Sequence, residues 1–192
     1  MHSIKANDAA DAYIAAVTTV DVYGYNIITE DGKLTREVRN LVIEIRHPDQ
    51  GYPIPGSKWN LRALEVYANQ LLDPNEKGFD YDYGSRLGRR NQINVAIEHL
   101  RNSPSTRRAI LTTRDLDKDL FAQHTPCLQV VEFLIRNNEL EMTCFFRSHD
   151  VRDAYPANIY GLNSLQRYVA NDLDVTPGRM TTMSCSAHYY VE

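Results

Sequence analysis

Two apolar runs separated by a pair of asparagines constrain the fold of this chain more than any other feature. The runs span residues 128–135 and 140–146, and Asn137 and Asn138 stand between them. Asparagine tolerates the positive φ that a two-residue hairpin turn requires, so this stretch predicts a β-hairpin. Alternation of side chains along the second arm is typical of a strand with one buried face.

The predicted hairpin brings Arg147 back beside Cys127, although twenty residues separate the two in the sequence. A thiol is an effective nucleophile only as the thiolate, and a nearby guanidinium that cannot lose its proton favours this anion. Cys127 is therefore a candidate nucleophile. From this pair alone, the other interpretation is that Cys127 is a small buried hydrophobic residue and Arg147 a surface residue.

Three short segments around the hairpin resemble, in order and spacing, the folate-dependent thymidylate synthases and the related pyrimidine-nucleotide hydroxymethylases. They match the family's Pro-Cys, Arg-Ser-x-Asp and Pro-x-Asn segments, and here they read Thr125-Pro126-Cys127, Arg147-Ser148-His149-Asp150 and Pro156-Ala157-Asn158. The resemblance extends from about Gly51 to Tyr190. It implies an α+β fold, a single domain over residues 1–192, in which a large mixed β-sheet is flanked by helices and dimerises through the sheet.

The chain as a whole fits one domain, because 192 residues can bury a substantial core and no Pro-, Gly- or Ser-rich linker divides them. A net charge of -4 makes non-specific nucleic-acid binding a poor expectation, although a basic pocket for one phosphate is compatible with it. No apolar run approaches the roughly 18 residues of a membrane span, so we expect a cytoplasmic protein without membrane partners. Three cysteines and six scattered histidines lack zinc-site spacing, so we expect reduced thiols and no metal.

Hydrophobic periodicity predicts several further elements. The expected helices span residues 7–20, 61–72, 93–100 and 159–169. The expected strands are residues 41–45 and 183–190, with another that begins at Ala109. Asn158 then lies at or near the start of the last helix, where capping would explain it without any functional role.

The resemblance assigns a set of basic and polar residues to the 5'-phosphate of a nucleotide. The set is Arg107, Arg108, Arg147, Ser148 and a loop arginine, either Arg36 or Arg39. In the resembling family, Arg107 and Arg108 would reach the active site of the other subunit, which implies a symmetric homodimer. Adjacent arginines on an extended segment face opposite ways, so a solvated edge is the alternative interpretation for this pair.

Other residues are assigned to the base, the sugar and the one-carbon donor. Asn158 would present its amide to the O4 and N3–H edge of uracil, where cytosine-specific relatives carry Asp, so the resemblance favours dUMP. An amide can also flip and suit cytosine. His188 and Tyr190 would bind the sugar hydroxyl, and Asp150 would bind the pterin edge of 5,10-methylenetetrahydrofolate, the co-substrate.

Two residues are assigned to proton transfer around the base, Tyr83 and Glu65. Tyr83 resembles the family's Tyr-Gly tyrosine, and a buried structural phenol would explain it nearly as well. The alignment of Leu61 and Arg62 places Tyr67 where the family has its catalytic glutamate, with Glu65 about half a turn away. An exposed helical carboxylate is the alternative interpretation of Glu65.

The sequence therefore predicts a one-carbon transferase acting at C5 of a pyrimidine nucleoside 5'-monophosphate through a Cys127 adduct at C6. Reductive methylation of dUMP to dTMP is the first expectation, and hydroxymethylation of CMP, dCMP or dUMP is the alternative. Leu128 and Phe146 stand where many members have His and Gln. The chain stops at Glu192, whereas typical members continue into a segment that closes over the folate, so hydration of a bound methylene is plausible. A catalytically idle nucleotide-binding relative is the third possibility.

Overall fold

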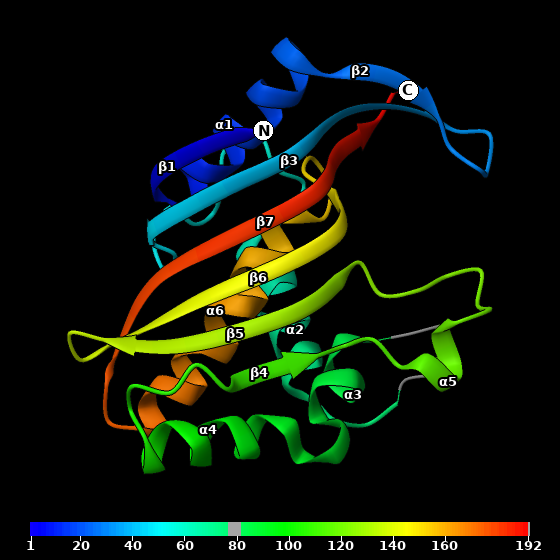
Figure 1. Ribbon diagram of the computed structural model, residues 1–192. Coiled ribbons are helices and arrows are strands. Elements are labelled where there is room, and N and C mark those ends of the chain that lie inside the picture. Colours follow the sequence, from blue (N-terminus) through cyan, green and yellow to red (C-terminus); the bar gives the residue numbers. More distant parts are fainter. Residues whose placement is uncertain (77–81, 192) are drawn as a thin grey trace.

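The computed structural model describes residues 1–76 and 82–191 and contains one seven-stranded sheet with helices packed on one of its faces (Figure 1). The elements, in chain order, are β1 (His2–Asp8), α1 (Ala9–Tyr23), β2 (Tyr25–Ile28), β3 (Leu34–His47), α2 (Leu61–Leu72), α3 (Tyr83–Gly88), the 3-10 turn η1 (Arg89–Asn91), α4 (Gln92–Asn102), β4 (Ala109–Thr112), α5 (Leu116–Asp119), β5 (Leu128–Arg136), β6 (Glu139–Asp150), α6 (Tyr155–Asp172) and β7 (Thr176–Tyr190).

The strands form a mixed sheet in the order β1-β3-β7-β6-β5-β4, and β2 pairs with one end of β3. The β1–β3 and β6–β7 pairs are parallel, whereas β3–β7, β5–β6, β4–β5 and β2–β3 are antiparallel. The predicted α+β class, with one large mixed sheet flanked by helices, is confirmed. The sheet and helices share one hydrophobic core.

The predicted hairpin is present as β5 and β6. Asn137 and Asn138 have φ values of 51° and 63°, as a two-residue turn between twisted strands requires. The register shifts between Leu128 and Val130, at the start of β5. Such irregularities are frequent beside active sites, because they redirect the chain and its side chains.

The central helix α6 packs between the sheet and α2, and most of its residues are buried. The expected helix at 61–72 matches α2, and the expected helix at 7–20 corresponds to α1. The strands β1 and β2 and the short helices α3 and α5 were not predicted. Strand β3 begins at Leu34 and not at Leu41, so Arg36 and Arg39 lie on a strand and not in a loop. Seven residues of β1 carry little alternation of their own, and the strand is held by its parallel pairing with β3.

Gly51 anchors the start of α1 in a way that only glycine permits. It has φ of +87°, and a Cβ there would lie 2.7 Å from the Ala10 amide nitrogen and 2.7 Å from Oδ1 of Asp8, the N-cap of α1. We expect Gly51→Ala to lower the free energy of unfolding by about 2 kcal/mol or more, which corresponds to a fall in Tm of roughly 5 °C.

The matched control for Gly51 is Gly32→Ala, because Gly32 also has positive φ, +75°, yet has open space around its Cβ position. The control reports the conformational strain alone, about 1 kcal/mol. Calorimetry of both variants separates the two effects. Equal losses of stability would show that the contact with the α1 cap contributes nothing.

Neither a membrane-spanning helix nor a metal-ligating cluster of three or more His, Cys, Asp or Glu occurs within residues 1–76 and 82–191. The longest helix of this part, α6, has 18 residues and carries several polar ones. Three of these, Asn158, Asn163 and Gln166, are buried. Gln166 satisfies carbonyl groups of Leu140 and Gly178 with its amide nitrogen, so its burial is structural.

Candidate active site

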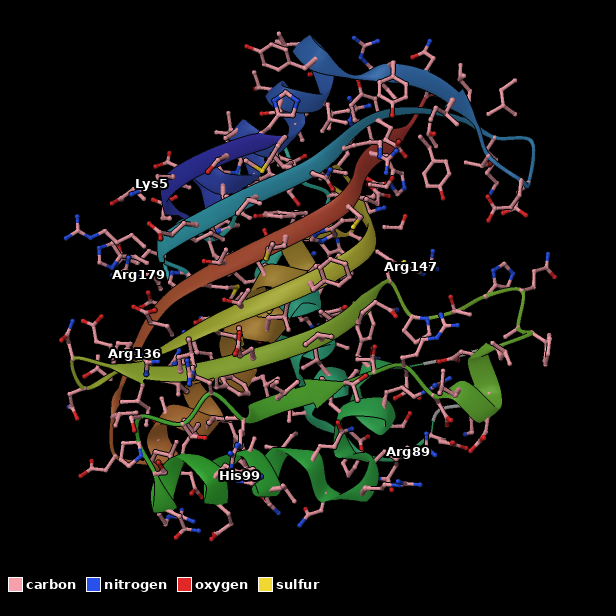
Figure 2. The ribbon with its side chains drawn as sticks, in the orientation of Figure 1. Lys5, Arg89, His99, Arg136, Arg147 and Arg179 are labelled. Atoms are coloured by element: carbon pink, nitrogen blue, oxygen red, sulfur yellow. The ribbon has the colours of Figure 1, made fainter. Side chains whose placement is uncertain are left out.

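The predicted site residues gather at one end of the sheet. The parallel strands β6 and β7 both end there, the antiparallel β5 begins there, and α6 starts just after β6 (Figure 1). Figure 2 shows Arg147 at this end, with Arg136 and Arg179 at the opposite end. The topology therefore brings together residues from three segments that are far apart in the sequence.

The Cys127 segment is fixed on both sides by hydrogen bonds. The Arg147 amide donates to the Cys127 carbonyl at 2.9 Å, and the Leu128 amide donates to the Tyr83 hydroxyl at 3.1 Å. Cys127 is half-buried, while Leu128 is fully buried beside it. The thiol thus lies on a rigid backbone at the edge of the core, where a reagent can still reach it.

Arg147 also contacts this segment through its side chain. Its Nε donates to the Pro126 carbonyl at 3.0 Å, and its Nη2 donates to the Thr125 carbonyl at 2.8 Å. The predicted proximity of Cys127 and Arg147 is confirmed.

The ends of β6 and β7 place an acid, an imidazole and a phenol together. Asp150 pairs with His188 across the parallel strands, and the rings of His188 and Tyr190 meet edge to face at 5.6 Å. Burial raises the pKa of Tyr190, and the charges of Asp150 and Cys127 raise it further. Tyr190 is therefore within electrostatic reach of both. His188 is buried, and its Nδ1 has no partner among the described residues.

Asp150 and Ser148 lie at the C-terminal end of strand β6, and their surroundings differ. Oδ1 of Asp150 accepts hydrogen bonds from the amides of Arg152 at 3.0 Å and Asp153 at 2.9 Å. These bonds shape the turn that leads into α6, so Asp150 has a structural role whatever else it binds. Ser148 is half-buried and pairs with Ser186 of β7.

Asn158 lies inside the first turn of α6, where Ala154 is the N-cap. Its side chain turns away from the helix end: Oδ1 accepts from the Tyr67 hydroxyl at 2.6 Å, and Nδ2 lies 3.2 Å from Nε2 of His149. The capping explanation of Asn158 is therefore wrong. The amide is buried and points into the cluster.

Tyr67, and not Glu65, joins this cluster from α2. Residues two apart on a helix lie about 200° apart around its axis, so Glu65 points the other way and is exposed. Tyr67 also lines a hollow of about 400 Å³ together with Trp59, Arg62 and others. The alignment of Leu61 with the family's leucine places Tyr67 at the position of the family's catalytic glutamate. Because Tyr67 is not an acid, sequence reasoning favours Glu65 instead.

His149 is a site residue that sequence reasoning missed. Its ring stacks on Phe146 at 3.8 Å between centroids, and its Nδ1 lies 3.0 Å from Oγ of Ser184. Burial, with a smaller contribution from His188, lowers the pKa of His149 to about 3, so the ring is neutral at pH 7. It occupies the variable position of the Arg-Ser-x-Asp segment, and no spacing rule identifies it.

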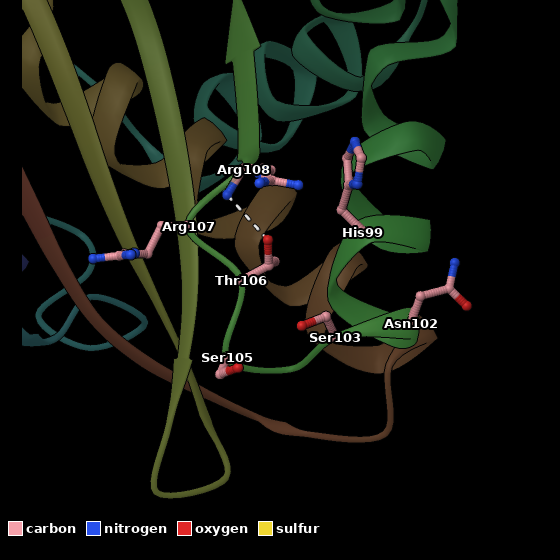
Figure 3. Close-up of a pocket in the computed structure, with 7 residues that line it drawn as sticks. All are labelled: His99, Asn102, Ser103, Ser105, Thr106, Arg107 and Arg108. Atoms are coloured by element: carbon pink, nitrogen blue, oxygen red, sulfur yellow. Dashed lines mark hydrogen bonds between the residues drawn. The ribbon is translucent and has the colours of Figure 1, made fainter.

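Arg107 and Arg108 are not part of this end of the sheet. They precede β4 and line a hollow of about 350 Å³ with His99, and Figure 3 shows their side chains pointing to opposite sides of the chain. Ala109 pairs with Phe133. This register places the arginines roughly 20 Å from Cys127, at about 3.3 Å per residue. Both are exposed, and neither has an ion-pair partner among the described residues.

Arg36 contacts the end of α1. Its Nε donates to the Val20 carbonyl at 3.1 Å, and its Nη2 donates to the Asp21 carbonyl at 2.9 Å. These carbonyls belong to the last turn of the helix, which a guanidinium satisfies well. A phosphate contact of Arg36 stays a prediction, because these bonds would have to rearrange.

The sequence model of the thymidylate synthase family matches residues 21–192. The chain belongs to the thymidylate synthase family. Its members are one-carbon transferases that use methylenetetrahydrofolate as co-substrate. The match spans every segment that meets at the end of the sheet, from α2 to β7.

Relatives of this chain from archaea align with nearly its whole length. A protein of Methanococcoides burtonii named "Putative thymidylate synthase" is 40% identical over 192 residues, covering 97% of this chain and 88% of its own length. Proteins of the same name from Methanosarcina barkeri and Methanocaldococcus jannaschii are 38% and 34% identical. They cover 97% and 100% of this chain, and 88% and 92% of their own lengths.

Proposed function

We propose that this protein transfers a one-carbon unit from 5,10-methylenetetrahydrofolate to C5 of dUMP and releases dTMP. The observation that carries the proposal is the Arg147 clamp: both the amide and the guanidinium of Arg147 bind the backbone around Cys127. A thiol held in this way beside a permanent positive charge suits a nucleophile better than a core residue.

The Cys127 thiolate would add to C6 of the uracil ring, and the electron pair of the C5–C6 double bond would move to form an enolate at O4. C5 of the enolate then attacks the one-carbon unit. The two carbon–nitrogen bonds that hold this unit in the donor would break, and the tetrahydrofolate left behind would supply the hydride that reduces the unit to a methyl group, which yields dihydrofolate. Loss of the C5 proton and expulsion of the Cys127 sulfur restore the ring. Tyr83, whose hydroxyl accepts a hydrogen bond from the Leu128 amide, would take part in the proton transfers.

The phosphate would be bound next to the thiol. Arg147 uses Nε and Nη2 for the backbone, and its Nη1 has no hydrogen bond to the residues that the structure describes. Ser148 follows it on β6. Arg36 is a further candidate. A fixed phosphate aligns C6 over the sulfur, so remote binding energy accelerates the reaction.

The base and sugar would lie over the ends of β6 and β7. Asn158 uses one donor and one acceptor site of its amide inside the protein, which leaves one of each for O4 and N3–H of uracil. The unpaired Nδ1 of His188 and the neighbouring Tyr190 suit a sugar hydroxyl. A buried imidazole nitrogen without a partner is costly unless a ligand satisfies it.

The one-carbon donor would occupy the hollow beside Tyr67. This hollow is lined by Trp59, Arg62 and Tyr67, an aromatic and basic set that suits a flat ring and an acidic tail. Asp150 would accept from the pterin edge through Oδ2, since Oδ1 is occupied by the turn. Glu65 points away from this region, so we place no proton transfer on it.

Product analysis by mass spectrometry tests the proposal. The protein would be incubated separately with dUMP, UMP, dCMP and CMP, each with methylenetetrahydrofolate. A methyl group on dUMP, with dihydrofolate formed, is the expected result. A hydroxymethyl group on any of the four would identify the alternative, in which water replaces the hydride and the same first-step residues serve. If none of the four nucleotides yields a product, the remaining interpretation is a catalytically idle relative that binds nucleotides.

The active site would be completed by a second protomer. The face of the sheet opposite the described helices exposes Ile110 and Met183, which suits a symmetric dimer contact. Because Arg107 and Arg108 are remote from Cys127 of their own chain, they would serve the partner's phosphate site. Two exposed arginines with long side chains can turn towards one dianion.

A mixing experiment tests this arrangement in trans. Cys127→Ser protein and Arg107→Ala/Arg108→Ala protein are each expected to be inactive. Unfolded and refolded together, they should recover roughly a quarter of wild-type activity, since half of the dimers are mixed and each has one intact site of two. Recovery close to zero would show that the arginines act within their own chain, and full activity of the arginine variant alone would show that they do not act at all. Mixing each variant with itself is the control.

A further inference from the structure

Four side chains form a continuous hydrogen-bonded chain beneath the proposed base site. Tyr67 of α2 donates to Asn158 of α6 at 2.6 Å, and the Asn158 amide nitrogen lies 3.2 Å from Nε2 of His149 on β6. His149 continues the chain to Ser184 of β7, whose Oγ lies 3.0 Å from Nδ1. The chain links four elements that meet only through the tertiary fold.

We propose that Tyr67, His149 and Ser184 are positioning residues that fix the orientation of the Asn158 amide and thereby set the preference for uracil over cytosine. This inference rests on the proposed function, in which Asn158 contacts the base. None of the three positioning residues needs to touch the nucleotide. They act by deciding which end of the amide faces which side of the site.

The hydrogen-bond directions along the chain depend on one another. When Tyr67 donates to Oδ1, the Asn158 amide nitrogen faces His149 and donates to Nε2, so His149 carries its proton on Nδ1 and donates it to Ser184. Reversing the amide requires the opposite His149 tautomer and a reversed hydroxyl at both ends. Such chains favour one of two concerted arrangements over mixed ones.

His149 is suited to this role because its ring cannot rotate or take a charge easily. It is stacked on Phe146 and lies 5.0 Å from the ring of Tyr155. The nearby titratable group that affects it is His188, and burial keeps the imidazole neutral at ordinary pH. A neutral ring has one donor and one acceptor, which is what a directional chain requires.

The orientation matters because uracil and cytosine present opposite patterns. Uracil offers an acceptor at O4 and a donor at N3, whereas cytosine offers a donor at N4 and an acceptor at N3. An amide held one way by internal partners matches one base, and it matches the other only after reversal of the whole chain. An Asn without such partners would flip freely and discriminate poorly.

The first test is Tyr67→Phe, which removes only the hydroxyl. The measurement is the ratio of the dissociation constants for dUMP and dCMP by calorimetry, which needs no turnover. We expect the preference for dUMP to fall by about tenfold, the effect of one buried hydrogen bond. The control is Tyr52→Phe, since the Tyr52 hydroxyl is buried without a partner among the described residues. It should leave the ratio unchanged.

The second test is Ser184→Ala, which acts at the far end of the chain. It leaves a buried Nδ1–H without an acceptor, so the His149 proton should move towards Nε2, as nitrogen-15 NMR of the ring would report. The dUMP preference should fall with it, although Ser184 touches no substrate. An unchanged tautomer and unchanged ratios in both variants would overturn the inference.

These measurements separate the inference from the proposed function. If the wild type turns over dUMP but the ratios do not respond to either variant, the positioning chain fails and the function stands. If the wild type binds dUMP preferentially and the ratios respond, but no product forms, the chain stands and the function fails. If the wild type binds neither nucleotide, both are overturned.

Discussion

Replacement of Cys127 by serine is expected to lower turnover of dUMP by on the order of 10⁴-fold or more while nucleotide binding is retained. A serine hydroxyl is essentially un-ionised at neutral pH, so the positive charge of Arg147 has no anion to favour. The structure gives no reason for a folding defect, because Cys127 is half-buried and serine is nearly isosteric. The loss should therefore appear in the chemical steps and not in binding.

An isotope exchange measurement makes the Cys127 test independent of the co-substrate. Addition of the thiolate to C6 creates an enolate that takes up a solvent proton at C5 and can then lose the deuteron. Deuterium at C5 of dUMP should therefore exchange with water in the wild type and not in Cys127→Ser. The matched control is Cys185→Ser, a half-buried free cysteine of β7, which should exchange and turn over normally. Wild-type exchange in the Cys127 variant would exclude the thiol as the nucleophile.

The second large effect is expected from Asp119→Asn, and it is an effect on stability. Asp119 accepts from Nη1 and Nη2 of Arg86 at 3.0 and 2.8 Å and from the Asp115 amide at 2.7 Å, and all of these groups are buried. Neutralising one partner leaves Arg86 as an uncompensated buried charge, which costs about 3–5 kcal/mol. For a chain of this length, Tm should fall by roughly 10 °C.

The buried pair matters for the site as well as for stability. Arg86 lies three residues after Tyr83 on α3 and donates from Nη1 to the Thr113 carbonyl, and the Thr113 hydroxyl donates to the Leu128 carbonyl next to Cys127. The Arg86–Asp119 pair therefore holds α3 and the segment that follows β4 against the backbone next to Cys127. The matched control is Lys118→Met, since the Lys118–Glu76 ion pair is exposed and should contribute less than about 1 kcal/mol. Equal losses for both variants would contradict the expected cost of the buried charge.

The same cluster gives a pH dependence with a defined sign. Burial by itself raises the pKa of Asp119, but hydrogen bonds from Arg86 and the Asp115 amide outweigh it and hold the pKa below its ordinary value. A hydrogen bond from Arg89 lowers the pKa of Asp115. As the pH falls, the unfolded chain therefore binds more protons than the folded chain does. The ion pairs stabilise the fold above about pH 5, and their contribution is lost as the pH falls through the folded-state values. In Asp119→Asn, the free energy of unfolding should therefore depend less on pH in this acidic range than it does in the wild type.

Local chemistry explains the parts of the fold that the sequence predicts well. The hairpin depends on two asparagines that accept positive φ and on the alternation beside them, and both are properties of adjacent residues. The helix at 61–72 depends on periodicity and on the N-cap Asn60. By contrast, β1 is stabilised by a strand thirty or more residues away, so its own sequence carries little signal.

The candidate site divides in the same way. The motif residues Cys127, Arg147, Asp150 and Asn158 stand in short segments whose residue types and spacing point to their chemistry. The sequence by itself therefore determined the family, the candidate nucleophile and its basic neighbour. The positioning chain was decided only by the tertiary structure, because Tyr67 and Asn158 are 91 residues apart and His149 and Ser184 are 35 apart. A hydrogen bond needs two atoms within about 3 Å in a set direction. Residue order fixes that geometry only for near neighbours, and for these four side chains the packing of α2 on α6 and the parallel pairing of β6 with β7 supply it.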